Sequence, residues 1–98
     1  MTEKQLFKKA EEKAGEGKLL WFVSRGSGDI WGIFDAVALS QDGRVGFLQI
    51  TTIDNKWRRL HKIKDFMLRK DIHRLPTLSA LWCWDYNKCE FEVTNLND

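Results

Sequence analysis

Two mostly apolar segments joined by a turn signal constrain the fold of this chain more than any other feature. The segments are residues 34–39 and 44–52, and the residues between them include Gln41-Asp42-Gly43. Residues of this kind favour the tight turns that connect antiparallel strands. The pattern therefore predicts two neighbouring strands that form a hairpin.

The residues before this hairpin predict one helix and one strand. Thr2 and Gln5 match a Thr-x-x-Gln capping box, and apolar residues then recur at helical spacing. We expect the helix over residues 3–14, ended by the glycines of Gly15-Glu16-Gly17. Residues 19–23 are almost wholly apolar and predict a buried strand.

The residues after the hairpin predict a second helix and a second hairpin. Asp54-Asn55 is a plausible helix start, and the apolar stripe that follows consists of Trp57, Leu60, Ile63 and Met67. Residues 80–84 and 89–93 form the last two strands around a turn at residues 85–88. We expect Cys83 and Cys89 to be small core thiols. Trp82 and Trp84 are expected to pack against the second helix, with base stacking or a dimer interface as the alternatives.

The resulting order, α-β-β-β-α-β-β, predicts an α/β (α+β) fold with a mixed sheet flanked by helices. Ninety-eight residues allow a single domain over residues 1–98. No apolar run approaches the roughly 18 residues of a membrane span, and the first residues do not resemble a signal peptide. With only two cysteines and no membrane partner, the expected compartment is the reducing cytoplasm.

One carboxylate lies inside an apolar strand. Burial of Asp35 in its ionised form is costly without a partner. Gln49 follows fourteen residues later in the neighbouring strand, and the two side chains can converge if the register places them on one face. They then either hydrogen-bond to each other or to nearby backbone, or hold a divalent cation such as Mg²⁺ through oxygen atoms. Thr51 shares the face of Gln49.

These segments resemble the restriction-endonuclease-like superfamily of PD-(D/E)xK nucleases, especially its archaeal Holliday-junction-resolvase branch. The matching stretches are residues 24–28, 32–39 and 43–51, which read SRGSG, GIFDAVAL and GRVGFLQIT. The resemblance implies a metal-dependent nuclease in which Asp35, Gln49 and the Ile50 carbonyl oxygen hold Mg²⁺. It also implies a homodimer.

The resemblance places Thr51 at the position of the family's catalytic lysine. This is a departure from the family pattern, because a threonine hydroxyl is neutral. A displaced lysine, Lys56 or Lys62, is a candidate replacement from the following helix. Glu11 or Glu12 matches the glutamate that resolvases carry on their first helix, unless both are solvated surface charges.

Positive charge is concentrated in residues 56–74. This segment has eight basic and two acidic residues and a net charge of +6, which leaves −4 for the rest of a chain whose total is +2. A cationic helix face indicates contact with phosphates, and the alternative is a solvated amphipathic helix. The candidate DNA-binding residues are Arg25, Ser27, Lys56, Arg58, Arg59 and Lys62.

The sequence therefore predicts a DNA-binding protein of nuclease-like fold. The expected activity is hydrolysis of phosphodiester bonds in branched or duplex DNA, with four candidate catalytic residues, Asp35, Gln49, Thr51 and Lys62. The alternative, which the neutral Thr51 favours, is an inactive nuclease-fold module that binds DNA or a protein partner.

Overall fold

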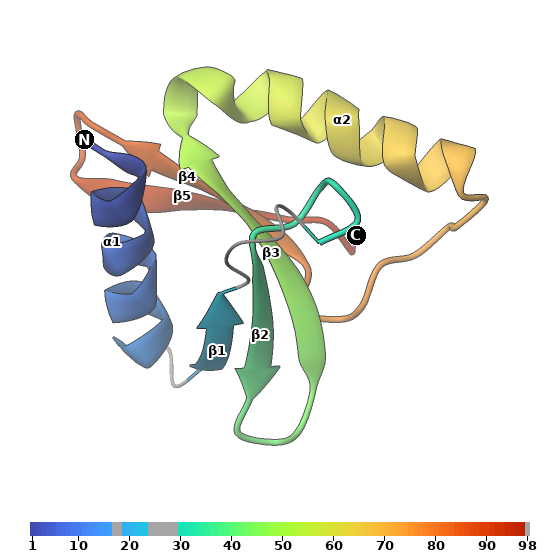
Figure 1. The fold of residues 1–98 in the computed structure, drawn as a ribbon, viewed down its shortest axis with the longest axis horizontal. Helices are drawn as coiled ribbons and strands as arrows, with labels where there is room; N and C mark the ends of the chain where they lie inside the picture. The colour runs from blue at the N-terminus through green and yellow to red at the C-terminus, as the bar shows by residue number, and fades with distance from the viewer. Residues whose placement is uncertain (17–18, 24–29, 98) are drawn as a thin grey trace.

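The helices and strands of the chain follow the predicted order. The computed structural model describes residues 1–16, 19–23 and 30–97. Its elements are α1 (Glu3–Glu16), β1 (Leu19–Val23), β2 (Ala36–Ser40), β3 (Val45–Thr52), the 3-10 turn η1 (Ile53–Asn55), α2 (Lys56–Arg69), β4 (Ala80–Asp85) and β5 (Glu90–Asn95) (Figure 1). The order α-β-β-β-α-β-β is confirmed. Neither helix in these ranges has the length and apolar character needed to cross a membrane.

The strands form one mixed sheet in the order β1-β2-β3-β4-β5. Neighbouring strands are antiparallel except β3 and β4, which pair in parallel with Ile50 opposite Trp82 and Thr51 opposite Cys83. A parallel pair needs a crossover connection, and α2 lies in that connection. The first turns of α2 therefore come directly after the carboxyl end of β3 and the short turn η1.

The capping box at the start of α1 is confirmed. The Thr2 backbone nitrogen donates to Gln5 Oε1 at 2.8 Å, and the Gln5 backbone nitrogen donates to Thr2 Oγ1 at 3.2 Å. These reciprocal bonds satisfy two of the backbone donors at the start of the helix. The local pattern of the sequence thus determines where α1 begins.

One face of the sheet packs against α1. Leu6, Ala10 and Ala14 of α1 share a buried cluster with Ala36, Ala38, Leu48, Ile50, Ala80, Trp82, Trp84 and Phe91. The predicted packing of Trp82 and Trp84 against the second helix is therefore wrong. The parallel register is the reason, because Trp82 lies opposite Ile50, whose side chain faces α1.

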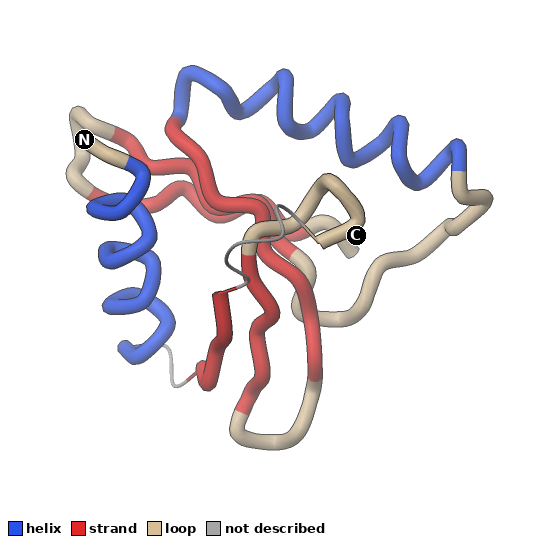
Figure 2. The backbone as a smooth tube through the Cα atoms, viewed as in Figure 1, coloured by secondary structure: helices blue, strands red, loops and turns tan. Residues whose placement is uncertain are grey.

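The other face of the sheet packs against α2, so that the sheet runs between the two helices (Figure 2). Ile63 and Phe66 of α2 are buried with Ile33, Phe34 and Leu75. The predicted inward position of Trp57 is wrong, because its side chain is 69% exposed. Trp57 lies six residues before Ile63, about one and two-thirds helical turns away, and therefore on a different side of α2.

The two cysteines lie in different surroundings. Cys83 is buried in β4, whereas Cys89 is exposed in the turn before β5. The prediction of a core thiol is confirmed for Cys83 and wrong for Cys89. The register of β4 and β5 pairs Cys83 with Glu92, and both cysteines are free thiols.

Candidate functional site

Asp35 and Gln49 meet beside the β2–β3 hairpin, as predicted. The Asp35 backbone nitrogen donates to the Leu48 carbonyl oxygen at 2.8 Å, which extends the strand pairing to the residue before β2. Gln49 Nε2 donates to Asp35 Oδ2 at 2.8 Å, and the Ile50 backbone nitrogen donates to the same oxygen at 2.9 Å. The convergence is confirmed, and its form here is the hydrogen-bonded alternative.

A cavity of about 320 Å³ adjoins this pair. Its wall comes from the first turns of α1, the carboxyl end of β3 and the start of α2. Both helix starts lie at the same end of the molecule (Figure 1). The lining residues are Met1, Thr2, Glu3, Leu6, Phe7, Asp35, Gln49, Ile50, Thr51, Thr52, Asn55 and Arg59. We call this space the Asp35 cavity.

Two buried polar atoms in the wall have no hydrogen-bond partner among the described residues. One is Oε1 of Gln49, a side chain that is 2% exposed, and the other is Nε of Arg59. Asp35 explains the first, because the Gln49 amide directs its nitrogen to the carboxylate and leaves its oxygen unbonded. A buried donor or acceptor without a partner costs about 1–3 kcal/mol. Both residues that carry these atoms line the Asp35 cavity.

Both candidate replacement lysines lie outside the wall. The Lys56 ammonium forms an ion pair with Glu92 of β5, and Lys62 is exposed six residues further along α2. The basic residue in the wall is Arg59. It precedes the buried Ile63 by four residues, which places it on the side of α2 that faces the sheet. The adjacent Arg58 is exposed and donates to Asn55 Oδ1.

Thr51 lies in the wall and is buried, being 6% exposed. The resemblance places a lysine there, whereas this chain has a neutral hydroxyl. Because Thr51 belongs to β3, it lies on the same strand as Gln49. The basic side chain of the described wall, Arg59, comes from α2 instead.

The first helix contributes a glutamate that sequence reasoning missed. Glu11 and Glu12 are exposed, which agrees with solvated surface charges, and neither lines the cavity. Glu3, in the first turn of α1, does line it. The capping box at Thr2 identified this helix start, but the place of Glu3 beside β3 depends on the folded topology.

The oxygen atoms of the site suit Mg²⁺. Asp35 offers a carboxylate, Gln49 an amide oxygen and Ile50 a backbone carbonyl, all of which are hard ligands. The buried Gln49 Oε1 without a partner fits a cation in particular. In the part of the chain that the structure describes, no three His, Cys, Asp or Glu residues form a metal-binding group. A site with one carboxylate remains suitable, because Mg²⁺ usually keeps several waters and needs one or two carboxylates.

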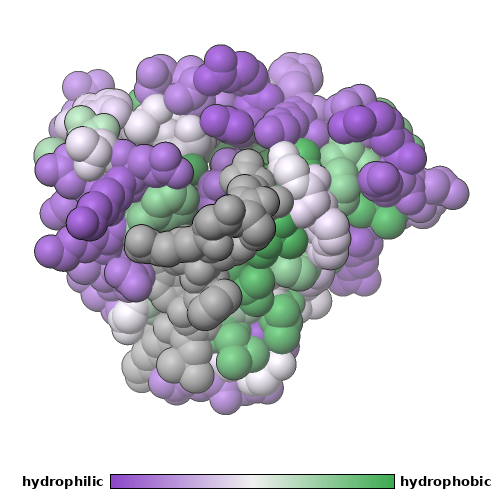
Figure 3. All heavy atoms as spheres, viewed as in Figure 1, coloured by the Kyte–Doolittle hydropathy of each residue, from purple (hydrophilic) through white to green (hydrophobic). Residues whose placement is uncertain are grey.

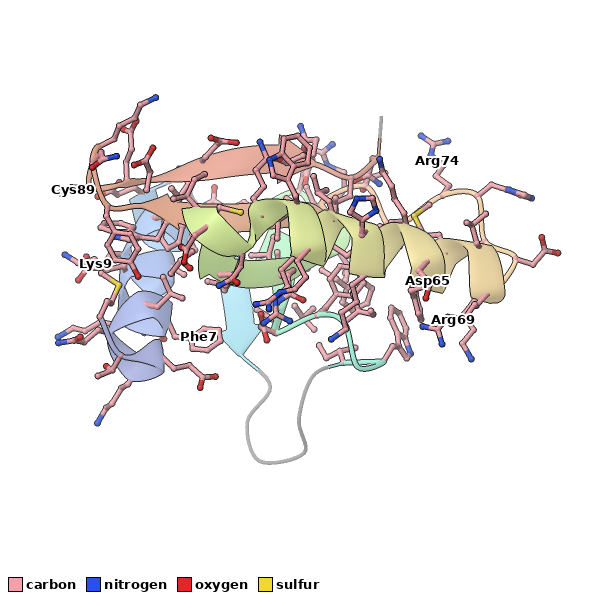
Figure 4. All side chains as sticks on the ribbon, turned by 90° about the horizontal axis from the view of Figure 1, so that it is seen from above. Phe7, Lys9, Asp65, Arg69, Arg74 and Cys89 are labelled. Atoms are coloured by element: carbon pink, nitrogen blue, oxygen red, sulfur yellow. The ribbon has the colours of Figure 1, made fainter. Side chains whose placement is uncertain are left out.

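An exposed basic surface extends along α2 and the segment after it. We define it by Arg58, Lys62, Lys64, Lys70 and Arg74, all of which are exposed. None of these five forms an ion pair with a described residue, whereas Arg69 pairs with Asp65 at 2.9 Å (Figure 4). Figure 3 shows hydrophilic surface over α2. The predicted contacts Arg25 and Ser27 lie outside the described residues.

Comparisons with known proteins assign no family to the chain. No family model matches it, and neither the curated proteins nor the solved structures contain a significant match. The function is therefore argued from the Asp35 cavity and the basic surface.

Proposed function

We propose that this protein binds DNA through phosphate contacts along α2 and hydrolyses a phosphodiester bond in the Asp35 cavity with Mg²⁺. The observation that carries the proposal is that α2 contributes to both features. Arg59 in its first turn lines the cavity, and the exposed Arg58 and Lys62, four residues apart on one side of the helix, continue the basic surface along it. A strand bound along α2 is thereby brought to the cavity. Contacts of this kind position DNA without reading its sequence.

The residues of the cavity have distinct roles in this proposal. Asp35, Gln49 and the Ile50 carbonyl oxygen would hold Mg²⁺, which when bound supplies a Lewis acid and lowers the pKa of a coordinated water. Asp35 is kept in position by the hydrogen bonds it accepts from Gln49 and Ile50. Thr51 offers a neutral hydroxyl to the bound phosphate group.

DNA binding without hydrolysis is the second candidate function, and Thr51 favours it. A neutral hydroxyl stabilises developing negative charge less than an ammonium group does. The basic surface does not depend on Thr51, so a chain that cleaves nothing would still bind phosphates. An acidic protein partner would use the same surface and would compete with DNA for it.

Salt dependence tests the binding proposal. The affinity for a fluorescently labelled duplex and for a four-way junction should be measured by anisotropy between about 50 and 200 mM salt. We expect a steep loss of affinity with salt and a slope that decreases by about 2 in the Arg58→Ala/Lys62→Ala variant. Lys8→Ala/Lys9→Ala, which removes two exposed charges from α1, is the matched control. An equal effect of both variants would contradict a DNA site on α2.

A cleavage assay separates the two candidate functions. Plasmid and four-way-junction DNA are incubated with the full chain and Mg²⁺ or Mn²⁺. Hydrolysis by the wild-type chain that Asp35→Asn abolishes would support the nuclease. Salt-sensitive binding without cleavage would support the binding module, and the absence of binding at low salt would exclude both.

We also propose that the protein is a homodimer in the cytoplasm. The resemblance supports the dimer, and the free thiols of Cys83 and Cys89 suit a reducing compartment. Sedimentation equilibrium should give twice the chain mass of 11.5 kDa. A mass equal to that of one chain at micromolar concentration would exclude the dimer.

A further inference from the structure

Arg59 differs from the other cations of α2 in its surroundings. Its Nε atom is buried and has no partner among the described residues, whereas the residues of the basic surface are exposed to water. A guanidinium carries a positive charge and only donates hydrogen bonds. A charged donor that is buried without an acceptor is more costly than a neutral one. Because Arg59 lines the Asp35 cavity, a ligand oxygen that reaches this Nε atom would satisfy it.

The second unpaired atom narrows the chemistry of that ligand. Gln49 Oε1 is an acceptor on another residue that lines the same cavity, so a phosphodiester alone, which carries no hydrogen-bond donor, leaves it unsatisfied. A cation alone likewise leaves Arg59 Nε unsatisfied. A phosphate group together with a divalent cation satisfies both atoms, because arginine binds phosphate oxygens and amide oxygens bind Mg²⁺. The two unpaired atoms therefore favour a metal–phosphate pair over either ion alone.

Arg59 also brings to the cavity a positive charge that Thr51 of β3, where the resemblance places a lysine, does not provide. Thr51 and Arg59 both line the Asp35 cavity, but they belong to β3 and α2 respectively. Lys56 is neutralised by Glu92 and Lys62 lies outside the wall. We infer that Arg59 binds a non-bridging phosphate oxygen in the Asp35 cavity and supplies from α2 the positive charge that Thr51 does not. This inference rests on the proposed function and names the phosphate-binding residue of the same site.

Nuclear magnetic resonance tests the contact directly, whether or not the chain cleaves DNA. The Nε–H signal of Arg59 in the full ¹⁵N-labelled chain is assigned by its loss in Arg59→Lys. Inorganic phosphate and a short DNA duplex are then titrated separately, each with and without Mg²⁺. We expect a saturable shift of this signal and tighter phosphate binding when Mg²⁺ is present.

A variant pair tests the energetic contribution of the guanidinium. Arg59→Met keeps the length and apolar stem of the side chain and removes its charge, and it should weaken phosphate binding about tenfold, as expected for a charge-assisted hydrogen bond. Arg44→Ala is the control, because Arg44 is an exposed arginine that pairs with Asp42 at 2.9 Å in the β2–β3 turn. We expect phosphate affinity in this control to equal that of the wild-type chain.

Each outcome bears on the inference separately from the proposed function. An Arg59 signal that stays fixed while phosphate saturates the protein would overturn the inference, as would wild-type affinity in Arg59→Met. A shift with inorganic phosphate but not with the duplex would support the contact and identify free phosphate as its source. Phosphate binding through Arg59 in a chain that cleaves no DNA would refute the proposed hydrolysis and support the inference. DNA cleavage by Arg59→Met at the wild-type rate would support the proposed hydrolysis and refute the inference.

Discussion

Asp35 determines how Gln49 is oriented. Gln49 Nε2 lies 2.8 Å from Asp35 Oδ2, and this bond leaves Gln49 Oε1 as a buried acceptor without a partner among the described residues. The same carboxylate oxygen accepts the Ile50 backbone nitrogen. The residue just before β2 therefore holds both a side chain and the backbone of β3.

The first prediction concerns the stability that Asp35 provides. Asp35→Ala should lower the free energy of unfolding by about 2–3 kcal/mol, because it leaves the Gln49 amide and the Ile50 backbone nitrogen without an acceptor. Asp35→Asn retains an oxygen acceptor and should cost less. Urea denaturation measures both values, with the exposed Asp54→Ala as a control within about 0.5 kcal/mol of the wild type. Equal losses in the two Asp35 variants would contradict the proposed orienting role.

The second prediction is that Arg59 reduces stability when no ligand is bound. Arg59→Met removes a buried donor without a partner and should raise the free energy of unfolding by about 1 kcal/mol in phosphate-free buffer. Phosphate with Mg²⁺ should stabilise the wild-type chain and not the variant, since a ligand that binds only the folded state raises its stability. Thermal unfolding with and without phosphate measures both effects. A destabilised variant would show that Arg59 has a structural role instead.

The third prediction concerns close packing beside β3. A Cβ atom at Gly46 would overlap the Cβ and backbone atoms of Leu78, so that only glycine fits this position of the strand. Gly46→Ala should therefore cost about 3 kcal/mol. Gly15→Ala is the matched control, because open space surrounds Gly15 in α1 and alanine favours a helix by roughly 0.5–1 kcal/mol. The midpoint of chemical denaturation should fall in Gly46→Ala and rise in Gly15→Ala.

The fold could be predicted wherever the signal was local. The capping box joins Thr2 to Gln5 across three residues, and the turn at residues 41–43 joins adjacent strands. The orientation of Trp82 could not be predicted in this way. It depends on the parallel register of β3 and β4, which pairs residues about thirty positions apart in the chain. Sequence periodicity indicates which residues share a face and leaves open which helix covers that face.

In the candidate site, too, local relationships could be predicted from the sequence and long-range ones could not. Asp35 and Gln49 were predicted to converge because a hairpin brings adjacent strands together at a fixed register. Glu3 and Arg59 belong to helices that reach the cavity only through the topology of the whole sheet. Arg59 was expected as one of several DNA contacts, and its distinct position follows from the buried Ile63 four residues later. Trp57, whose apolar side chain had suggested an inward position, is exposed.

The fourth prediction is a loss of stability at high pH that depends on Cys83. Burial, followed by the Glu92 carboxylate, raises the pKa of the Cys83 thiol from 9.0 to about 11. Between about pH 9 and 11 the unfolded chain releases this proton while the folded chain keeps it. The contribution of Cys83 to stability is therefore complete below pH 9 and is lost as the pH rises through about 11.

Urea denaturation from pH 8 to pH 11 tests this effect in a Cys89→Ser background, which leaves Cys83 as the one thiol of the chain. Cys83→Ala in that background should lose stability less steeply with pH, because the other titrating groups are common to both variants. Thiol labelling provides a second measurement. In the wild-type chain the exposed Cys89 should react with a thiol reagent at pH 8, and Cys83 should react only on unfolding, since a buried thiol with a raised pKa forms little thiolate. Equal pH slopes with and without Cys83 would show that its ionisation is not coupled to folding.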